Sequence, residues 1–297
     1  MNSPGTRAAT LPSDQPLTAV TICLVPAARH GPFVFHEGLE AGCRAAAELG
    51  FAGVEIFADG AAQLQSLPLE QLLREHGLRL AALGTGAGWL MHRLSLTDPD
   101  ADRRERAVEY VLGVIDRAGE CGAPTILGSM QGRIDGQATR REAQRWLFDA
   151  LARFGQRAER HGQFFLYEAL NRYETNLFNR QREAADAIAA AQCPGVKLLC
   201  DLFHMSIEEV ELAETLRELG PQIGHVHWAD SNRLAMGWGH TPATAVGRTL
   251  RSIDYCGWLS AEIFPIPDAM AAARQSQLSM RYAWQTAATQ PVLRNPE

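Results

Sequence analysis

The sequence lacks the stretch of about 18 consecutive apolar residues that a membrane-spanning helix needs. It also lacks an excess of positive charge, because its 297 residues carry a formal net charge of −6. Proteins that bind nucleic acid usually present a basic surface, so this charge argues against a nucleic-acid partner. We therefore expect neither a membrane nor a nucleic acid as a partner.

The six cysteines are scattered along the chain and form no C-x-x-C pair. They therefore indicate neither a structural zinc site nor a disulfide framework. The N-terminal residues are rich in Pro, Ser and Thr and lack the apolar core of a signal peptide. We expect a disordered leader at residues 1–17, one folded domain at 18–290, a C-terminal tail at 291–297, and by default a cytoplasmic location.

Short apolar runs, bounded by Gly, Pro or polar residues, alternate with longer amphipathic segments. Runs of this kind are typical of strands that are buried on both faces. The eight strand-like runs cover residues 20–25, 53–57, 78–86, 123–130, 163–170, 196–202, 223–230 and 259–264. The clearest helix-like segments cover residues 36–49, 102–121, 140–161, 206–219, 241–256 and 268–288.

Alternating strands and helices predict a parallel sheet, and closure into a barrel is the commonest solution at this length. A doubly wound open sheet is the structural alternative, but it needs a Gly-rich phosphate loop after the first strand. The segment VPAARHGPF at residues 25–33 is not such a loop. The expected fold is therefore α/β, a single-domain (β/α)₈ TIM barrel. Ser206 and Glu209 have the spacing of a capping box, which would begin the helix that ends at Leu219.

Ionisable residues in four consecutive strand-like runs are the strongest functional signal. Glu168, Asp201, His227 and Glu262 follow one another at intervals of 33, 26 and 35 residues, each about one strand–helix unit. The C-terminal ends of barrel strands form the active site in this fold. Three carboxylates and one imidazole suit Mn²⁺, Mg²⁺ or Co²⁺, of which we expect Mn²⁺. A metal would also stabilise carboxylates that are otherwise costly to bury in apolar strands.

Each of these residues also has an ordinary structural explanation. A single acid in a buried strand is more often part of an ion pair, and a single histidine, including His225, is often a core residue. The repetition on successive strands favours the metal site. Further polar candidates follow the same strands and would either face a ligand or lie in solvated loops: Glu174, His204 and Arg233. Residues after earlier strands that could line the far side of such a pocket are Trp89, His92, Gln131 and Arg133.

Four segments carry a resemblance to a known family: YEALNRYETNLFN (167–179), KLLCDLFHMSIEE (197–209), GHVHWADSNR (224–233) and AEIF (261–264). They resemble the xylose-isomerase-like TIM-barrel superfamily of sugar phosphate isomerases and epimerases, and within it the ketose 3-epimerases of the D-tagatose/D-psicose (allulose) type. The resemblance is weaker in the first two loops and around GSMQGR (128–133), where the distal end of the sugar is expected.

This resemblance implies a role for each candidate residue. The metal ligands would be Glu168, Asp201, His227 and Glu262, and two of them, Glu168 and Glu262, would also be the catalytic acid/base pair. The substrate-binding residues Glu174, His204 and Arg233 would hold the O1–O3 end of a small sugar. The resemblance also implies a homodimer or a homotetramer.

The function that follows is C3 epimerisation of a free ketose through a cis-enediolate. One glutamate would remove the C3 proton and the other would return a proton to the opposite face, while a metal stabilises the negative charge. An aldose–ketose isomerase, a keto-inositol dehydratase or a 3-keto-glycoside lyase would begin with the same proton abstraction. Outside this chemistry, an endonuclease-IV-like nuclease would need more metal ligands and a basic surface. A non-catalytic barrel would be expected to lack a ligand or a base.

Overall fold

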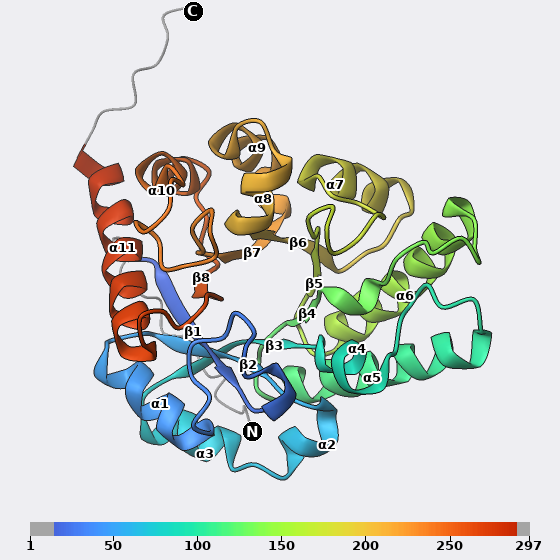
Figure 1. The fold of residues 1–297 in the computed structure, drawn as a ribbon, viewed down its shortest axis with the longest axis horizontal. Coiled ribbons are helices and arrows are strands. Elements are labelled where there is room, and N and C mark those ends of the chain that lie inside the picture. Colours follow the sequence, from blue (N-terminus) through green and yellow to red (C-terminus); the bar gives the residue numbers. More distant parts are fainter. Residues whose placement is uncertain (1–14, 290–297) are drawn as a thin grey trace, which may run out of the picture.

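Eight parallel strands form a closed barrel in the computed structural model, which describes residues 15–289 (Figure 1). The strands are β1 (Leu17–Cys23), β2 (Gly53–Phe57), β3 (Arg79–Gly84), β4 (Thr125–Leu127), β5 (Phe165–Glu168), β6 (Val196–Asp201), β7 (Ile223–His227) and β8 (Trp258–Ala261). Each strand pairs with the next one in the chain, and β8 pairs with β1. The predicted (β/α)₈ barrel is therefore confirmed.

The helices form a ring outside the strands, as Figure 1 shows. They are α1 (Leu39–Glu48), α2 (Gly60–Gln65), α3 (Leu69–Glu75), α4 (Ala87–His92), α5 (Ala101–Glu120), α6 (Arg140–Arg160), α7 (Gln181–Ala190), α8 (Leu202–Glu208), α9 (Leu212–Leu219), α10 (Ala243–Ser252) and α11 (Ala269–Thr289). Side-chain caps explain where the longest ones begin. Asp100 accepts hydrogen bonds from the first turn of α5, and Thr139 forms a capping box with Glu142 at the start of α6.

The expected helix from Ser206 to Leu219 is wrong, because two helices, α8 and α9, occupy this region. Ser206 lies inside α8, and its hydroxyl donates to the carbonyl of Leu202 at 2.6 Å. Asp201 caps α8 instead, with one carboxylate oxygen 2.7 Å from the backbone nitrogen of Phe203. A carboxylate at the end of a buried strand is a strong cap, whereas a serine hydroxyl within a helix can bond to the preceding turn.

The strand period places polar side chains above an apolar layer inside the barrel. Ala82, Ile126, Leu166 and Leu199 form a buried cluster contributed by four neighbouring strands, β3 to β6. Successive side chains of a strand point to opposite faces, so the residues two positions after Leu166 and Leu199 also point inward. Those residues are Glu168 and Asp201. The same geometry therefore builds the core of the barrel and aims the acids into its C-terminal end.

Residues 1–14 of the predicted leader, residue 290 and the whole predicted tail (291–297) lie outside the described residues. β1 begins at Leu17, the last residue of the predicted leader. Near the other end, Met280, Ala283 and Trp284 of α11 are buried against the barrel, whereas Tyr282 is exposed. Among residues 15–289, no helix is both long and apolar enough to span a bilayer.

Candidate metal centre and active site

Four side chains from neighbouring strands meet at the C-terminal end of the barrel. Glu168, Asp201 and His227 are the last residues of β5, β6 and β7, and Glu262 directly follows β8. One ligand atom of each lies within 4.8 Å of the corresponding atoms of the other three. The structure thus brings together all four residues that the strand spacing singled out.

The imidazole of His227 lies at the centre of this group. Its Nδ1 is 3.3 Å from Asp201 Oδ2, 3.5 Å from Glu262 Oε2 and 3.6 Å from Glu168 Oε1. Glu168 Oε1 is buried and has no hydrogen-bond partner. Buried polar atoms of this kind are normally satisfied, and a cation would satisfy this one. The oxygen and nitrogen donors also suit a hard divalent cation, so the four residues fit a metal.

The electrostatics of the three carboxylates are unequal. Burial raises the pKa of both Glu168 and Glu262. Burial would also raise the pKa of Asp201, but His204 and His227 hold it below its usual range. Carboxylates that share a buried site resist ionising together, and a divalent cation would favour the ionised form of all three. Binding of a divalent cation would therefore release protons from these carboxyl groups.

Glu55 of β2 holds His227 from the opposite side of its ring. Its Oε1 is 3.2 Å from His227 Nε2, and its Oε2 is 3.0 Å from His225 Nε2. Although burial would raise the pKa of Glu55, the two imidazoles hold it well below its usual range. A carboxylate behind a histidine fixes the ring so that the other nitrogen faces the metal. Sequence reasoning missed Glu55, although an acid within the apolar run GVEIF is the same kind of signal as at the other strands.

His204 presents one ring nitrogen to the site. Its Nδ1 accepts a hydrogen bond from Asn171 Nδ2 at 2.7 Å, which assigns the ring proton to Nε2. That Nε2 lies 3.7 Å from Glu168 Oε1. Burial lowers the pKa of His204 to about 3, so the ring is neutral at pH 7. His204 is therefore a neutral hydrogen-bond donor, and Asn171, which the sequence did not single out, orients it.

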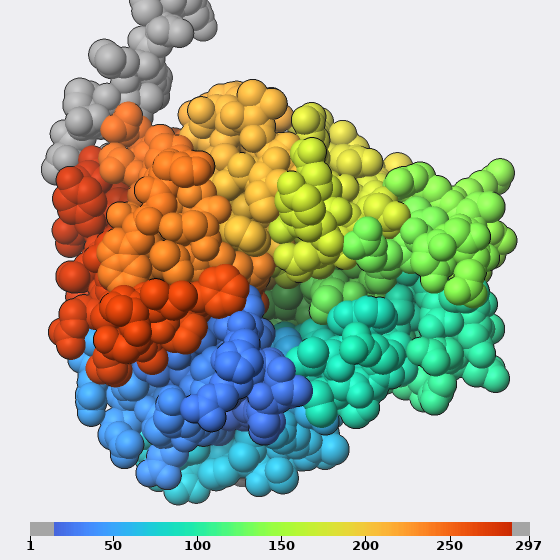
Figure 2. All heavy atoms as spheres, in the orientation of Figure 1, coloured from blue at the N-terminus to red at the C-terminus, as the bar shows by residue number. Residues whose placement is uncertain are grey.

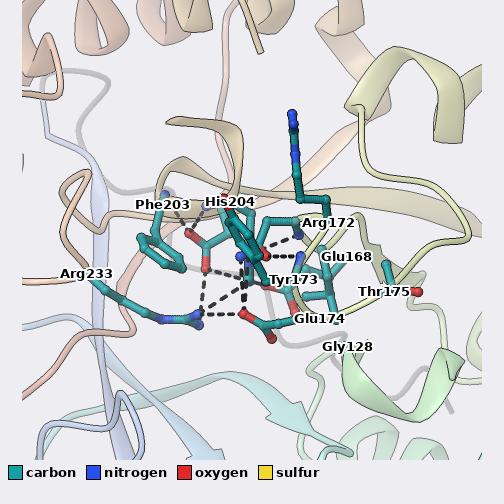
Figure 3. A network of polar contacts seen from close by, with 12 residues as sticks. Gly128, Glu168, Arg172, Tyr173, Glu174, Thr175, Phe203, His204 and Arg233 are labelled. Atoms are coloured by element: carbon teal, nitrogen blue, oxygen red, sulfur yellow. Dashed lines mark hydrogen bonds and ion pairs between the residues drawn. The ribbon is translucent and has the colours of Figure 1, made fainter. Parts of the chain in front are cut away.

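Arg233 and Glu174 approach one another next to His204 (Figure 3). Figure 3 shows the guanidinium of Arg233 pointing toward Glu174 and His204, whereas Arg172 points away from them. Arg233 forms an ion pair with Glu262, and its Nη1 lies 3.7 Å from Glu174 Oε1. The three predicted substrate-binding residues thus share one region next to the predicted metal ligands.

Asp230 shapes the loop that carries Arg233. Its buried carboxylate accepts hydrogen bonds of 2.7–2.9 Å from the backbone N–H groups of Ser231, Gly237, Gly239 and Thr241. Within this loop Arg233 has a φ of 60°, a left-handed backbone conformation that residues other than Gly rarely adopt. The closed loop therefore holds Arg233 in the backbone conformation that directs it into the site. No pattern in the sequence singled out Asp230.

The end of β4 packs closely behind Glu168. Gln131 donates hydrogen bonds of 3.0 Å to the carbonyl oxygens of Glu168 and Gly128, and it accepts one from the hydroxyl of Tyr167 at 2.6 Å. A Cβ atom on Gly128 would lie 2.7 Å from Glu168 Oε2, so a glycine leaves room for that carboxylate. Gln131 is buried and fixes β5 rather than lining the pocket.

A cavity of about 490 Å³ is lined by two of the four predicted ligands, Glu168 and Glu262. Glu168, Glu174, His204, Arg233 and Glu262 line its polar end, and its apolar wall contains Phe33, Phe57, Trp89, Leu90 and Phe264. Figure 2 shows the hollow near the centre of this face, between the blue, teal and yellow-green segments. Concave sites with a few convergent polar groups are typical of small-molecule binding. Of the other candidates, Arg133 lines a neighbouring cavity. His92 points toward Asp59, and its Nε2 lies 2.6 Å from Asp59 Oδ1.

Several proteins that are similar to this chain in sequence are epimerases. The chain is 30% identical to the L-ribulose 3-epimerase of Methylomonas sp. over 74% of this chain and 76% of that protein. It is 28% identical to the 3-dehydro-D-guloside 4-epimerase of Escherichia coli over 72% of this chain and 83% of that protein. The crystal structure of a D-allulose 3-epimerase from Methylomonas sp. is similar in fold, with a TM-score of 0.76 and 24% identity over 91% of this chain and 98% of that one.

The family model described as xylose isomerase-like TIM barrel matches residues 43–282. This match spans most of the described chain, including β2 to β8 and every residue of the candidate site except those before residue 43. The chain therefore belongs to the xylose isomerase-like TIM barrel family and, with curated epimerases as its relatives, is an enzyme of the isomerase class.

Proposed function

We propose that this chain is a metal-dependent sugar epimerase that inverts carbon 3 of a free ketose through a cis-enediolate. The observation that carries the proposal is the pairing of Glu168 and Glu262, two carboxylates that line one cavity. Each lies within 3.6 Å of the same nitrogen of His227. Epimerisation needs two such groups, because the proton leaves from one face of the carbon and returns to the other.

Glu168, Asp201, His227 and Glu262 would hold the divalent cation, for which Mn²⁺ is our first choice and Mg²⁺ or Co²⁺ are alternatives. When bound, such a cation supplies Lewis-acid stabilisation of negative charge on substrate oxygens. Glu55 keeps the ring of His227 turned toward the cation.

The protein's own groups handle the proton. One of Glu168 and Glu262 takes the proton from C3, and the electron pair of the broken C–H bond moves into the enediolate. The other glutamate, in its protonated form, then donates a proton to the opposite face of C3. Because the cation would favour the ionised form of both glutamates, the one that donates must first receive its proton from the substrate or from solvent.

Three further groups would orient the sugar. The Nε2–H of His204 and the guanidinium of Arg233 are donors for the developing oxyanion, and both line the cavity next to the carboxylates. Glu174 offers an acceptor for a sugar hydroxyl, and burial raises its pKa as well. These residues would select a substrate with adjacent carbonyl and hydroxyl oxygens.

A second candidate is epimerisation at C4 of a sugar that carries a ketone at C3. The similarity to the 3-dehydro-D-guloside 4-epimerase of Escherichia coli favours it. The chemistry is the same, since a proton next to a ketone is removed and returned. The two candidates differ only in which carbon of the substrate exchanges its proton.

The test is an exchange experiment in D₂O, followed by NMR. Metal-stripped and Mn²⁺-loaded protein are incubated with fructose, psicose, tagatose, sorbose and ribulose. We expect deuterium at C3 and a new epimer with the loaded protein only, because proton abstraction depends on the cation. Deuterium at C1 with formation of an aldose would indicate an isomerase instead. No exchange in any ketose, despite tight metal binding, would overturn the free-ketose proposal.

A further inference from the structure

A second cavity of about 350 Å³ adjoins the cavity above the predicted metal ligands. The two cavities share three wall residues, Trp89, Ser129 and Glu174, and therefore lie side by side. We propose that the second cavity is a subsite for a glycosyl group, so that a ketose linked to a second sugar binds more tightly than the free ketose. This inference rests on the proposed sugar specificity of the first cavity.

The first cavity is large enough for a whole monosaccharide, so the second cavity is available for another chemical group. At about 490 Å³, the first cavity already falls within the range of about 300–1,000 Å³ that is typical of complete small-molecule sites. A monosaccharide held next to Glu168 and Glu262 has room within it. A substituent on that monosaccharide would pass Trp89 and enter the second cavity.

Trp89 provides a flat surface at the junction of the two cavities. Its side chain belongs to α4 and remains 39% exposed, although it lines both cavities. The guanidinium of Arg93 lies over the indole, 5.3 Å from the ring centroid, and supports it from one side. An indole combines a large apolar face with little conformational freedom, which suits packing against the C–H face of a pyranose.

The second cavity offers both hydrogen-bond donors and acceptors. Within residues 15–289, Arg93 and Arg133 line it without forming an ion pair. Arg133 uses one N–H to bond the backbone oxygen of Tyr173 at 3.0 Å, which leaves further donors of its guanidinium for a ligand. Asp135 and Glu174 provide carboxylate acceptors on the same wall.

The charges of this cavity favour a neutral ligand over an anion. Three arginines and three acidic residues line it: Arg93, Arg103, Arg133, Asp98, Asp135 and Glu174. A phosphate or carboxylate would meet repulsion from the acidic side chains. A hydroxylated ring uses donors and acceptors together, because each hydroxyl can donate one hydrogen bond and accept others.

The experiment measures binding to the Mn²⁺-loaded protein by calorimetry. Fructose is compared with three glycosyl fructoses that carry the second sugar at O4, O5 or O6 (lactulose, leucrose and isomaltulose). We expect at least one of them to bind about tenfold more tightly than fructose, as one or two additional charge-assisted hydrogen bonds would give. Arg93→Ala and Arg133→Ala should each reduce this ratio. Arg182→Ala, which removes an exposed arginine paired with Asp186 on α7, is the matched control and should not.

Equal affinities for fructose and all three glycosyl fructoses would overturn the subsite, as would a ratio unchanged in both cavity variants. Tighter binding of fructose 6-phosphate than of every glycosyl fructose would also overturn it, in favour of an anion site. Deuterium exchange into the same sugars separates the two proposals. Exchange into fructose without tighter disaccharide binding would leave the proposed function intact and refute the subsite. Tight, arginine-dependent disaccharide binding without any exchange would support the subsite and refute the epimerase.

Discussion

Glu168 and Glu262 carry the same carboxyl group but have different neighbours. Glu262 forms an ion pair with Arg233 and is partly buried. Glu168 has one buried oxygen without a hydrogen-bond partner and lies against Gly128. The proposed mechanism needs both carboxylates, because each would serve a different face of the same carbon.

Replacing either glutamate by glutamine tests this requirement. Glu168→Gln and Glu262→Gln should each lower kcat by about 10²–10⁴-fold, the usual contribution of a general acid or base. Epimer formation by NMR measures the effect, and circular dichroism checks that the fold is retained. Glu218→Gln, at an exposed position on α9, is the control and should keep full activity. Near-normal turnover in both active-site variants would rule out the two-glutamate mechanism.

Glu55 is expected to act through His227 rather than on the substrate. Glu55→Gln should weaken Mn²⁺ binding by about 10–100-fold, because groups that orient metal-ligating histidines typically contribute this much. A metal titration measures the loss, and Glu55→Asp should restore part of it by keeping the negative charge. A variant that binds Mn²⁺ as tightly as the original protein would show that Glu55 has only a structural role.

At the scale of elements, the loop between β7 and α10 carries Arg233. Asp230 organises this loop through four backbone N–H groups, and residue 233 then occupies its left-handed conformation. The backbone N–H of Phe264 donates to the carbonyl of Arg233 at 2.9 Å, which joins the loop to the segment after β8. The positions of Arg233 and Glu262 are therefore coupled through the backbone.

Asp230→Asn should disturb this loop, because the neutral amide is a weaker acceptor and places an N–H₂ group against backbone donors. We expect a loss of about 2 kcal/mol or more in the free energy of unfolding, as for other unsatisfied buried polar groups. We also expect a higher KM, since Arg233 would no longer be held in place. Urea denaturation and steady-state kinetics measure the two effects. Unchanged stability and KM would show that the loop does not depend on this carboxylate.

At the scale of the whole molecule, an ion pair joins two outer helices. Arg117 of α5 is only 6% exposed and contacts Glu70 of α3 through both of its terminal nitrogens. The hydrogen bonds and positive charge of Arg117 lower the pKa of Glu70 to about 2, below its ordinary value of 4.5. A carboxylate with a lowered pKa in the folded state stabilises that state above its unfolded pKa and loses the effect as the pH falls.

The stabilisation by this pair should therefore be complete at pH 7 and disappear between about pH 4.5 and pH 2. Because Glu70 is 45% exposed, solvent screening limits the contribution to about 1 kcal/mol. The measurement is the difference in melting temperature between the original protein and Glu70→Gln as a function of pH. The prediction fails if this difference is the same at pH 7 and at pH 3.

The assembled barrel also explains which sequence predictions succeeded. The strand at residues 53–57 was predicted with its observed bounds. The predicted single helix from Ser206 to Leu219 was wrong, because the residue that caps α8 is Asp201 at the end of the preceding strand. The capping role of Asp201 was not recognised, because the sequence pattern indicated a metal ligand at this position. The predicted cytoplasmic location and the homodimeric or homotetrameric assembly stay predictions.

Local pattern in the sequence was enough to predict the barrel and four converging side chains, because strand period and repeat spacing place residues at the same end of neighbouring strands. Only the tertiary structure revealed Glu55, which reaches His227 from a strand 172 residues earlier in the chain. It also revealed the hydrogen bonds of Asp230 to the backbone of its loop and the second cavity beside Trp89. These features depend on which non-adjacent segments come into contact across the closed barrel, and no periodicity along the chain encodes such contacts.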